Sequence, residues 1–191
     1  LIRNRSVMGC WLVTLGACLG LGMFMSFIPL HARERGLDAG QIGLIFFTQG
    51  LANGLSRIPF GFLSDKVGRR STLVVIGMAG FALSLLGLGA AVRMPHFVLG
   101  ALLSGLSLGL AFTSVGALIA EAVPAGSRGV AMGGYNTCIY WGMMTSSLAM
   151  GAVIESLGFA LSFYLIAFVN LGFSAMFIVM LKSAKRSKGL P

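Results

Sequence analysis

The chain of 191 residues carries 57% hydrophobic and only 10% charged residues, with a mean hydropathy of +0.92. A soluble domain needs far more surface charge, so this composition indicates an integral membrane protein. The formal net charge of +9 would suit a nucleic-acid partner. The basic residues are divided among short loops and form no basic face, however, which argues against nucleic-acid binding.

Six apolar stretches are each long enough to cross a bilayer as a helix, which takes about 20 residues. Their apolarity is continuous rather than alternating, which excludes membrane β-strands. Outside these stretches the chain holds no room for a soluble catalytic domain, so we predict a non-enzymatic, all-α membrane protein. The predicted spans are 7–30, 41–63, 72–92, 97–120, 129–154 and 159–181, followed by a basic tail at 182–191.

Lys and Arg are unevenly divided between the two sides that six spans define. The side of the termini holds ten of them and the opposite side three, which places both termini in the cytoplasm and the chain in the cell membrane. The ten are Arg3, Arg5, Lys66, Arg69, Arg70, Arg128, Lys182, Lys185, Arg186 and Lys188, and the three are Arg33, Arg35 and Arg93.

The first apolar stretch is too long for the core of a signal peptide and no small-residue cleavage site follows it, so we expect it to be retained. The chain begins at Leu1 rather than Met, from which we expect a segment upstream. Cys10, Cys18 and Cys138 all lie inside apolar stretches and are interpreted as small buried hydrophobes, with no disulfide or metal site.

The second span carries Gln49, Asn53 and Arg57 at spacings of four residues, which puts them in one stripe on a helix face. Two interpretations stay open: the stripe lines a solute path, or it hydrogen-bonds to neighbouring helices. Arg57 is near enough to the end of the span to extend its guanidinium into the interface.

The ten residues from Gly61 to Arg70 form a short segment rich in charged residues and glycine between the second and third spans. We predict both a water-facing hairpin and a functional hinge here.

The fourth span places Ser107, Ser114 and Glu121 on one face, with Thr113 beside them. Glu121 lies at the cytoplasmic end, where it could pair with the arginines of the hairpin and release them in another conformation. The pattern Gly105-x-Ser107-x-Gly109 matches that of a hydrolase nucleophile, but no strand or histidine base accompanies it. The two histidines, at the external ends of spans, have no third ligand for a metal.

The fifth span carries Asn136, Tyr140, Met143 and Ser147 on one face, a mixture that suits an adaptable pocket of mixed polarity. Glycines recur at four-residue spacing in several spans, which favours close helix packing in lipid. These pairs are Gly16/Gly20, Gly50/Gly54, Gly105/Gly109 and Gly129/Gly133.

The hairpin resembles the signature of the major facilitator superfamily, written G-x-x-x-D-[RK]-x-G-R-[RK], at each specified position. Those positions are Gly61, Asp65, Lys66, Gly68, Arg69 and Arg70. Arg57-Ile58-Pro59-Phe60 and the turn containing Glu121 and Arg128 also resemble their counterparts in the family. The resemblance implies that the hairpin's Asp and Arg latch one conformation, through a helix start and an acidic residue at a helix end.

Members of this family normally have two such halves, so the resemblance implies a six-helix half bundle with a 3+3 inverted repeat. The absence of an intramembrane Arg in the fourth span and of a Gly-Pro motif in the fifth favours the C-terminal half. The partner is then the missing half, with the solute between the halves near the midplane. The wall of the solute path would include Phe24, Phe27, Gln49, Asn53, Thr113, Asn136 and Tyr140.

We therefore predict half of a secondary transporter that moves a small, uncharged or amphipathic organic solute by alternating access, without a cofactor or a metal. No carboxylate lies at mid-membrane, so a proton-coupling residue is expected in the other half. The alternative is a binding, assembly or solute-sensing module on the same fold, which would associate with a solute without moving it.

Overall fold

The computed structural model describes residues 4–187, which form five α-helices and one short 3-10 turn without any strand. The elements are α1 (Arg5–Glu34), α2 (Ala39–Val67), α3 (Arg70–Gly89), α4 (Met94–Ala122), the 3-10 turn (Ala125–Ser127) and α5 (Arg128–Ser187). The prediction of an all-α class is confirmed for this part of the chain. Of the predicted tail, residues 182–187 continue α5, and the remainder lies outside the described residues.

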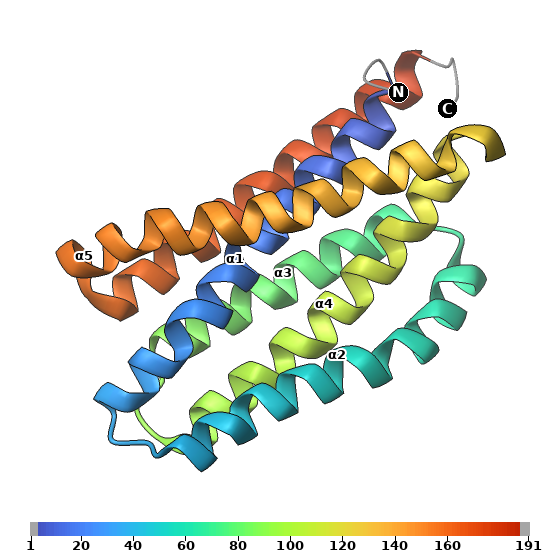
Figure 1. Cartoon of the computed structure of the whole chain (residues 1–191). Helices are drawn as coiled ribbons and strands as arrows, with labels where there is room; N and C mark the ends of the chain where they lie inside the picture. The colour runs from blue at the N-terminus through green and yellow to red at the C-terminus, as the bar shows by residue number, and fades with distance from the viewer. Residues whose placement is uncertain (1–3, 188–191) are drawn as a thin grey trace.

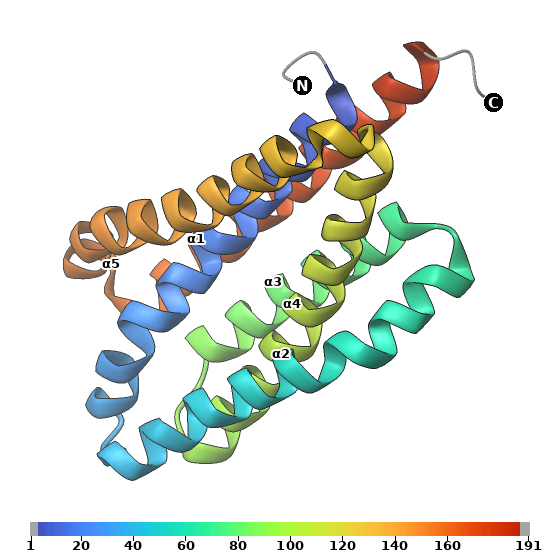
Figure 2. The same ribbon diagram turned by 45° about the vertical axis from the view of Figure 1, so that its right-hand side comes forward.

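The longest helix, α5, contains one residue with non-helical backbone angles, Gly158, at φ 75° and ψ 172°. This region of backbone space is accessible essentially only to glycine. Figures 1 and 2 show the chain turning back on itself here, so that the arms 128–157 and 159–187 run side by side. A single glycine thus replaces the loop between two antiparallel helical arms.

Four of the helices in residues 4–187 are long and apolar enough to cross a membrane: α1, α3, α4 and α5. The predicted second span lies in α2, whose apolarity is lowered by Gln49, Asn53 and Arg57, and the predicted fifth and sixth spans both lie in α5. The structure thus gives four apolar helices, which is fewer than the six separate spans expected from the sequence.

Short-range signals set the ends of α2. Asp38 accepts a hydrogen bond from the backbone N–H of Gln41 at 2.8 Å, and the Gln41 side chain accepts one from the Asp38 N–H at 3.0 Å. This reciprocal capping box satisfies two N–H groups that the first turn leaves without helical partners. At the other end Gly68 adopts the left-handed conformation, with φ 62°, that commonly terminates a helix.

The helices form two groups, and α3 connects them. One group pairs α1 with both arms of α5, and the other has α2 and α3 on either side of α4. In addition, α3 packs on α5, whereas α1 and α2 barely touch. The largest fully buried side chains are aromatic: Phe24, Phe81, Phe97, Phe163 and Phe177.

Two of the four glycine pairs predicted from the sequence are packing positions. A methyl group on Gly105 would lie 2.4 Å from the backbone oxygen of Gln49, so α4 and α2 touch there through their backbones. Gly16 and Gly20 similarly face Phe173 and Phe81. The other two pairs, Gly50/Gly54 and Gly129/Gly133, face open space in the described part of the chain.

One end of the bundle gathers segments that are distant in sequence. The Asn4 side chain donates to the carbonyl oxygen of Ala122 at 2.9 Å, and the Arg5 guanidinium hydrogen-bonds Ser183. The start of α1, the end of α4 and the second arm of α5 therefore meet at one end, where Arg70 also reaches Glu121.

Candidate functional site

The hairpin of residues 61–70 is built by the end of α2, the left-handed Gly68 and the start of α3. Because Gly68 reverses the chain within two residues, Asp65 of α2 and Arg70 of α3 come together across the turn. The guanidinium Nη2 of Arg70 lies 2.8 Å from the Asp65 carboxylate oxygen Oδ1. The sequence motif is therefore a folded unit with an internal ion pair.

Arg70 also forms a second ion pair, with α4. Its Nη1 lies 2.8 Å from Oε1 of Glu121, so one guanidinium holds two carboxylates from two different helices. The Arg70 side chain is 18% exposed, against 73% for Asp65 and 60% for Glu121. The sequence predicted a pairing of Glu121 with the arginines of the hairpin, and the structure places Arg70 in that position.

The charges at the start of α3 explain why the two carboxylates belong together. A cation in the first helical turn is unfavourable because the helix N-terminus carries partial positive charge. Arg70 occupies that turn, and the Arg69 side chain makes no capping hydrogen bond there. Asp65 and Glu121 supply the compensating negative charge. Both carboxylates are largely exposed, so each pair contributes on the order of 0.2–1 kcal/mol after solvent screening.

The other motif residues lie around this cluster without joining it. The side chains of Lys66, Arg69 and Arg128 are exposed. Gly61 faces α4, and a methyl group added to it would lie 3.9 Å from a methyl carbon of Thr113. Arg57 donates through Nε to the Asn53 side-chain oxygen at 3.1 Å, a bond within one face of α2.

The seven predicted solute-path residues fall into three sets by exposure. Phe24 is fully buried and packs edge-on against Phe46, with ring centroids 5.5 Å apart, and Gln49 is 4% exposed. Three residues are half-buried: Phe27, Asn53 and Thr113. Asn136 and Tyr140 are exposed. The structure does not gather all seven around one cavity.

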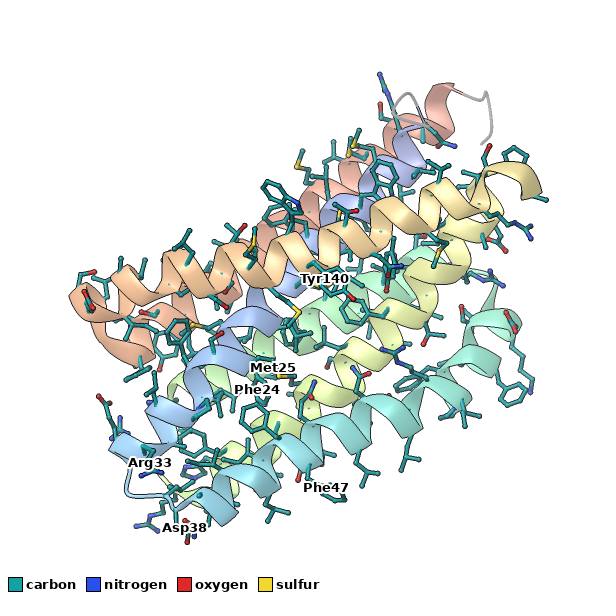
Figure 3. The ribbon with its side chains drawn as sticks, viewed as in Figure 1. Phe24, Met25, Arg33, Asp38, Phe47 and Tyr140 are labelled. Atoms are coloured by element: carbon teal, nitrogen blue, oxygen red, sulfur yellow. The ribbon has the colours of Figure 1, made fainter. Side chains whose placement is uncertain are left out.

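Tyr140 is 73% exposed. It projects from the first arm of α5, and Figure 3 shows it between that arm and the region of Met25 and Phe24 on α1. Further along the same predicted face, Ser147 hydrogen-bonds Ser26 of α1 at 2.7 Å. One end of this face is therefore a contact with α1, and the other end is accessible.

Sequence reasoning missed the environment of His31. Its imidazole is buried near Phe97, Phe159 and Phe163, with centroid distances of 5.3, 5.2 and 5.9 Å. Neither ring nitrogen has a hydrogen-bond partner among the described residues. The four residues come from α1, α4 and the second arm of α5, so no local pattern could have indicated this cluster.

Cavities between helices lie within the described part of the chain, and three of them are not lined by the predicted solute-path residues. One of about 450 Å³ lies between α2 and α4, and another of about 460 Å³ lies between α3 and α4. The third, of about 320 Å³, lies between α3 and the end of α5. Among the residues described, no three His, Cys, Asp or Glu side chains are placed to share a metal ion.

The long apolar helices and the charged hairpin define a helical membrane protein of the type indicated by the sequence motif. The family model of the Major Facilitator Superfamily matches residues 10–191. The chain therefore belongs to the major facilitator superfamily, as its hairpin motif predicted.

Two relatives show how much of a superfamily protein this chain matches. It is 27% identical over 168 residues to an uncharacterized MFS-type transporter of Methanocaldococcus jannaschii. It is 22% identical over 169 residues to the quinolone resistance protein NorA of Staphylococcus aureus. Each match covers 88% of this chain and 43% of the relative, so the chain spans less than half the length of these relatives.

Proposed function

We propose that this chain is one half of a secondary transporter that works by alternating access, with six membrane passes and both ends in the cytoplasm. In this proposal α2 crosses the membrane despite its polar stripe, and α5 crosses twice by reversing at Gly158. The partner is a second six-helix half, and the favoured placement of this chain is the C-terminal half. The proposed solute is uncharged or amphipathic, consistent with the name of the quinolone resistance relative.

The double ion pair of Arg70 is the observation that best supports this function. It joins α2, α3 and α4 at one end of the bundle through exposed carboxylates. An exposed ion pair is weak enough to break during a conformational cycle, and its loss changes the relative free energies of two states without any chemistry. The cluster therefore has the properties of a reversible latch on the state in which this end is closed.

The solute path is proposed to run along the side of the bundle where Tyr140 is exposed. A large aromatic side chain with a hydroxyl is a common contact for an amphipathic ligand. Exposed Tyr140 and Asn136 would face the other half, and the half-buried Asn53 and Thr113 would add polar groups from α2 and α4.

Accessibility of Tyr140 from both sides of the membrane tests the proposal without knowledge of the solute. The full-length protein, with Cys10, Cys18 and Cys138 replaced by alanine, would carry Tyr140→Cys as its single thiol in this half. A membrane-impermeant maleimide is then added to right-side-out and to inside-out vesicles. A matched variant, Phe168→Cys, places the thiol at an exposed apolar position on the other arm of α5.

Alternating access predicts labelling of Tyr140→Cys from both sides and little labelling of Phe168→Cys from either side. Labelling from one side only would support the binding or sensing module and overturn the transport proposal. Equal labelling of the two variants would show that Tyr140 has no special place on a solute path.

A further inference from the structure

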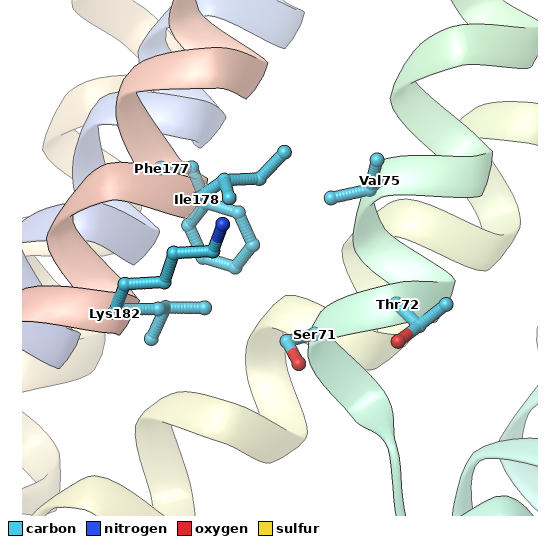
Figure 4. A pocket seen from close by; sticks show the side chains of 7 residues that line it. Ser71, Thr72, Val75, Phe177, Ile178 and Lys182 are labelled. Carbon is cyan, nitrogen blue, oxygen red and sulfur yellow. The ribbon is translucent and has the colours of Figure 1, made fainter. Parts of the chain in front are cut away.

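The cavity between α3 and the end of α5 lies outside the proposed solute path and latch. Its volume is about 320 Å³, and Figure 4 shows the first turn of α3 on one side and the last part of α5 on the other. It is lined by Ser71, Thr72 and Val75 of α3 and by Phe177, Ile178, Leu181 and Lys182 of α5.

This lining is divided by polarity along the helix axes. The three polar residues of the lining are near helix ends, Ser71 and Thr72 in the first turn of α3 and Lys182 near the end of α5, and aliphatic and aromatic residues line the remainder. In the view of Figure 4 the ammonium group of Lys182 extends back toward Ile178. Phe177 is fully buried and forms a rigid apolar wall. A ligand that fits such a lining has a polar head and an apolar body.

The cavity lies where two apolar stretches end. The apolar run of α3 was predicted to begin at Thr72 and that of α5 to end at Leu181, and both residues line it. A helix that crosses a bilayer passes from hydrocarbon to headgroups at such a point. The polar end of the cavity is therefore at the depth of the headgroups, and its apolar walls are at the depth of the acyl chains.

The charges around the polar end favour an anion. The two carboxylates of this end, Asp65 and Glu121, are both paired with Arg70. Among residues 4–184, whose side chains the structure describes, no carboxylate lies within ion-pair distance of Lys182. Arg5 adds a further positive charge nearby through its hydrogen bond to Ser183.

We infer that this cavity binds an anionic glycerophospholipid of the adjoining leaflet. The phosphodiester would accept hydrogen bonds from Lys182 and from the hydroxyls of Ser71 and Thr72. The first methylene groups of the acyl chains would pack on Val75, Ile178 and Leu181. Basic pockets between membrane helices are a recognised type of lipid headgroup site. This inference rests on the membrane placement of the chain under the proposed function, and not on transport itself.

The test measures lipid binding to the full-length protein in detergent by native mass spectrometry, with dioleoyl phosphatidylglycerol as the probe. Lys182→Gln should weaken the first bound lipid about fivefold, the usual effect of one basic residue near an anionic surface. Val75→Trp should weaken phosphatidylglycerol and phosphatidylcholine alike, because the indole fills the space for the acyl chains. Arg35→Gln, which removes an exposed charge from the opposite end, should bind as the wild type does.

Three results would overturn the inference: wild-type lipid affinity in Lys182→Gln, an equal loss in Arg35→Gln, or competition by millimolar inorganic phosphate, which would indicate a simple anion site. If Lys182→Gln does not fold, Val75→Trp still decides the location of the site. The measurement needs no solute movement, so a protein that fails the Tyr140 labelling test can still pass it.

Discussion

Arg70 and Glu121 are joined by an ion pair of 2.8 Å between the first turn of α3 and the last turn of α4. The same guanidinium holds Asp65 of α2, so three helices meet at one side chain. The other interhelical contacts of the bundle are mostly apolar. The stability of this cluster therefore depends more than theirs on the charges of the residues that form it.

Glu121→Gln should shift the full-length protein away from the state in which this end is closed. Since an exposed pair contributes up to about 1 kcal/mol, the ratio of the two states should change by up to about fivefold. The rate of maleimide labelling at Tyr140→Cys from each side measures that ratio. Glu155→Gln removes an exposed carboxylate near the α5 reversal and serves as the control, with no expected change.

Asp65→Asn should alter solute flux at unchanged membrane abundance, and its effect should not add to that of Glu121→Gln. The two carboxylates share one partner, so loss of either changes the charge environment of the other. Flux of a fluorescent amphipathic probe into vesicles, measured for both single variants and the double variant, gives the coupling free energy between the two carboxylates. If the wild type transports the probe and Asp65→Asn transports it at the same rate, Asp65 is not part of the latch.

Gly105→Val should destabilise the packing of α2 on α4. Its Cβ would lie 2.4 Å from the Gln49 backbone oxygen, and backbone cannot move aside as a flexible side chain can. We expect a loss of a few kcal/mol, typical of overpacking, seen as a lower Tm in detergent. Gly50→Ala faces open space and should be neutral or stabilising by up to about 1 kcal/mol.

His31→Leu should leave the protein at least as stable as the wild type. The imidazole buries two ring nitrogens without described partners, a cost of about 1–3 kcal/mol that leucine removes. Loss of stacking with the phenylalanines would offset about 0.5–1.5 kcal/mol of this gain. His96→Leu, at an exposed position, is the comparison. A Tm well below the wild type for His31→Leu alone would show that the imidazole makes a stabilising polar contact.

Gly158→Ala should strain the reversal of α5. A Cβ at φ 75° and ψ 172° costs about 1–3 kcal/mol, although no neighbouring atom would touch it. Gly172→Ala lies in regular helix with the same open surroundings and should be neutral or stabilising. Neither added Cβ meets a neighbouring atom, so a lower Tm for Gly158→Ala than for Gly172→Ala in thermal unfolding would report backbone strain alone. Equal Tm values would mean that the arms can be joined in another conformation.

The sequence by itself determined the class, the family and the hairpin motif. Apolar runs of this length have few alternatives to membrane helices, and a motif of six specified residues in ten is a local pattern that needs no knowledge of packing. The sequence also placed Glu121 at the same end as the hairpin, because alternate connections of a helical bundle lie on the same side.

Only the tertiary structure decided which residues touch. It selected Arg70 rather than Arg69 as the partner of Glu121, because the left-handed Gly68 sets the direction of the next residues. It separated Phe24, which is buried, from Tyr140, which is exposed, although both were predicted to line one path. Helical periodicity predicts which residues share one face of a helix. Which helix that face packs against depends on the rotation of each helix about its axis and on the crossing angles between helices. Those rotations come from long-range contacts such as Gly105 on Gln49, which no local pattern contains.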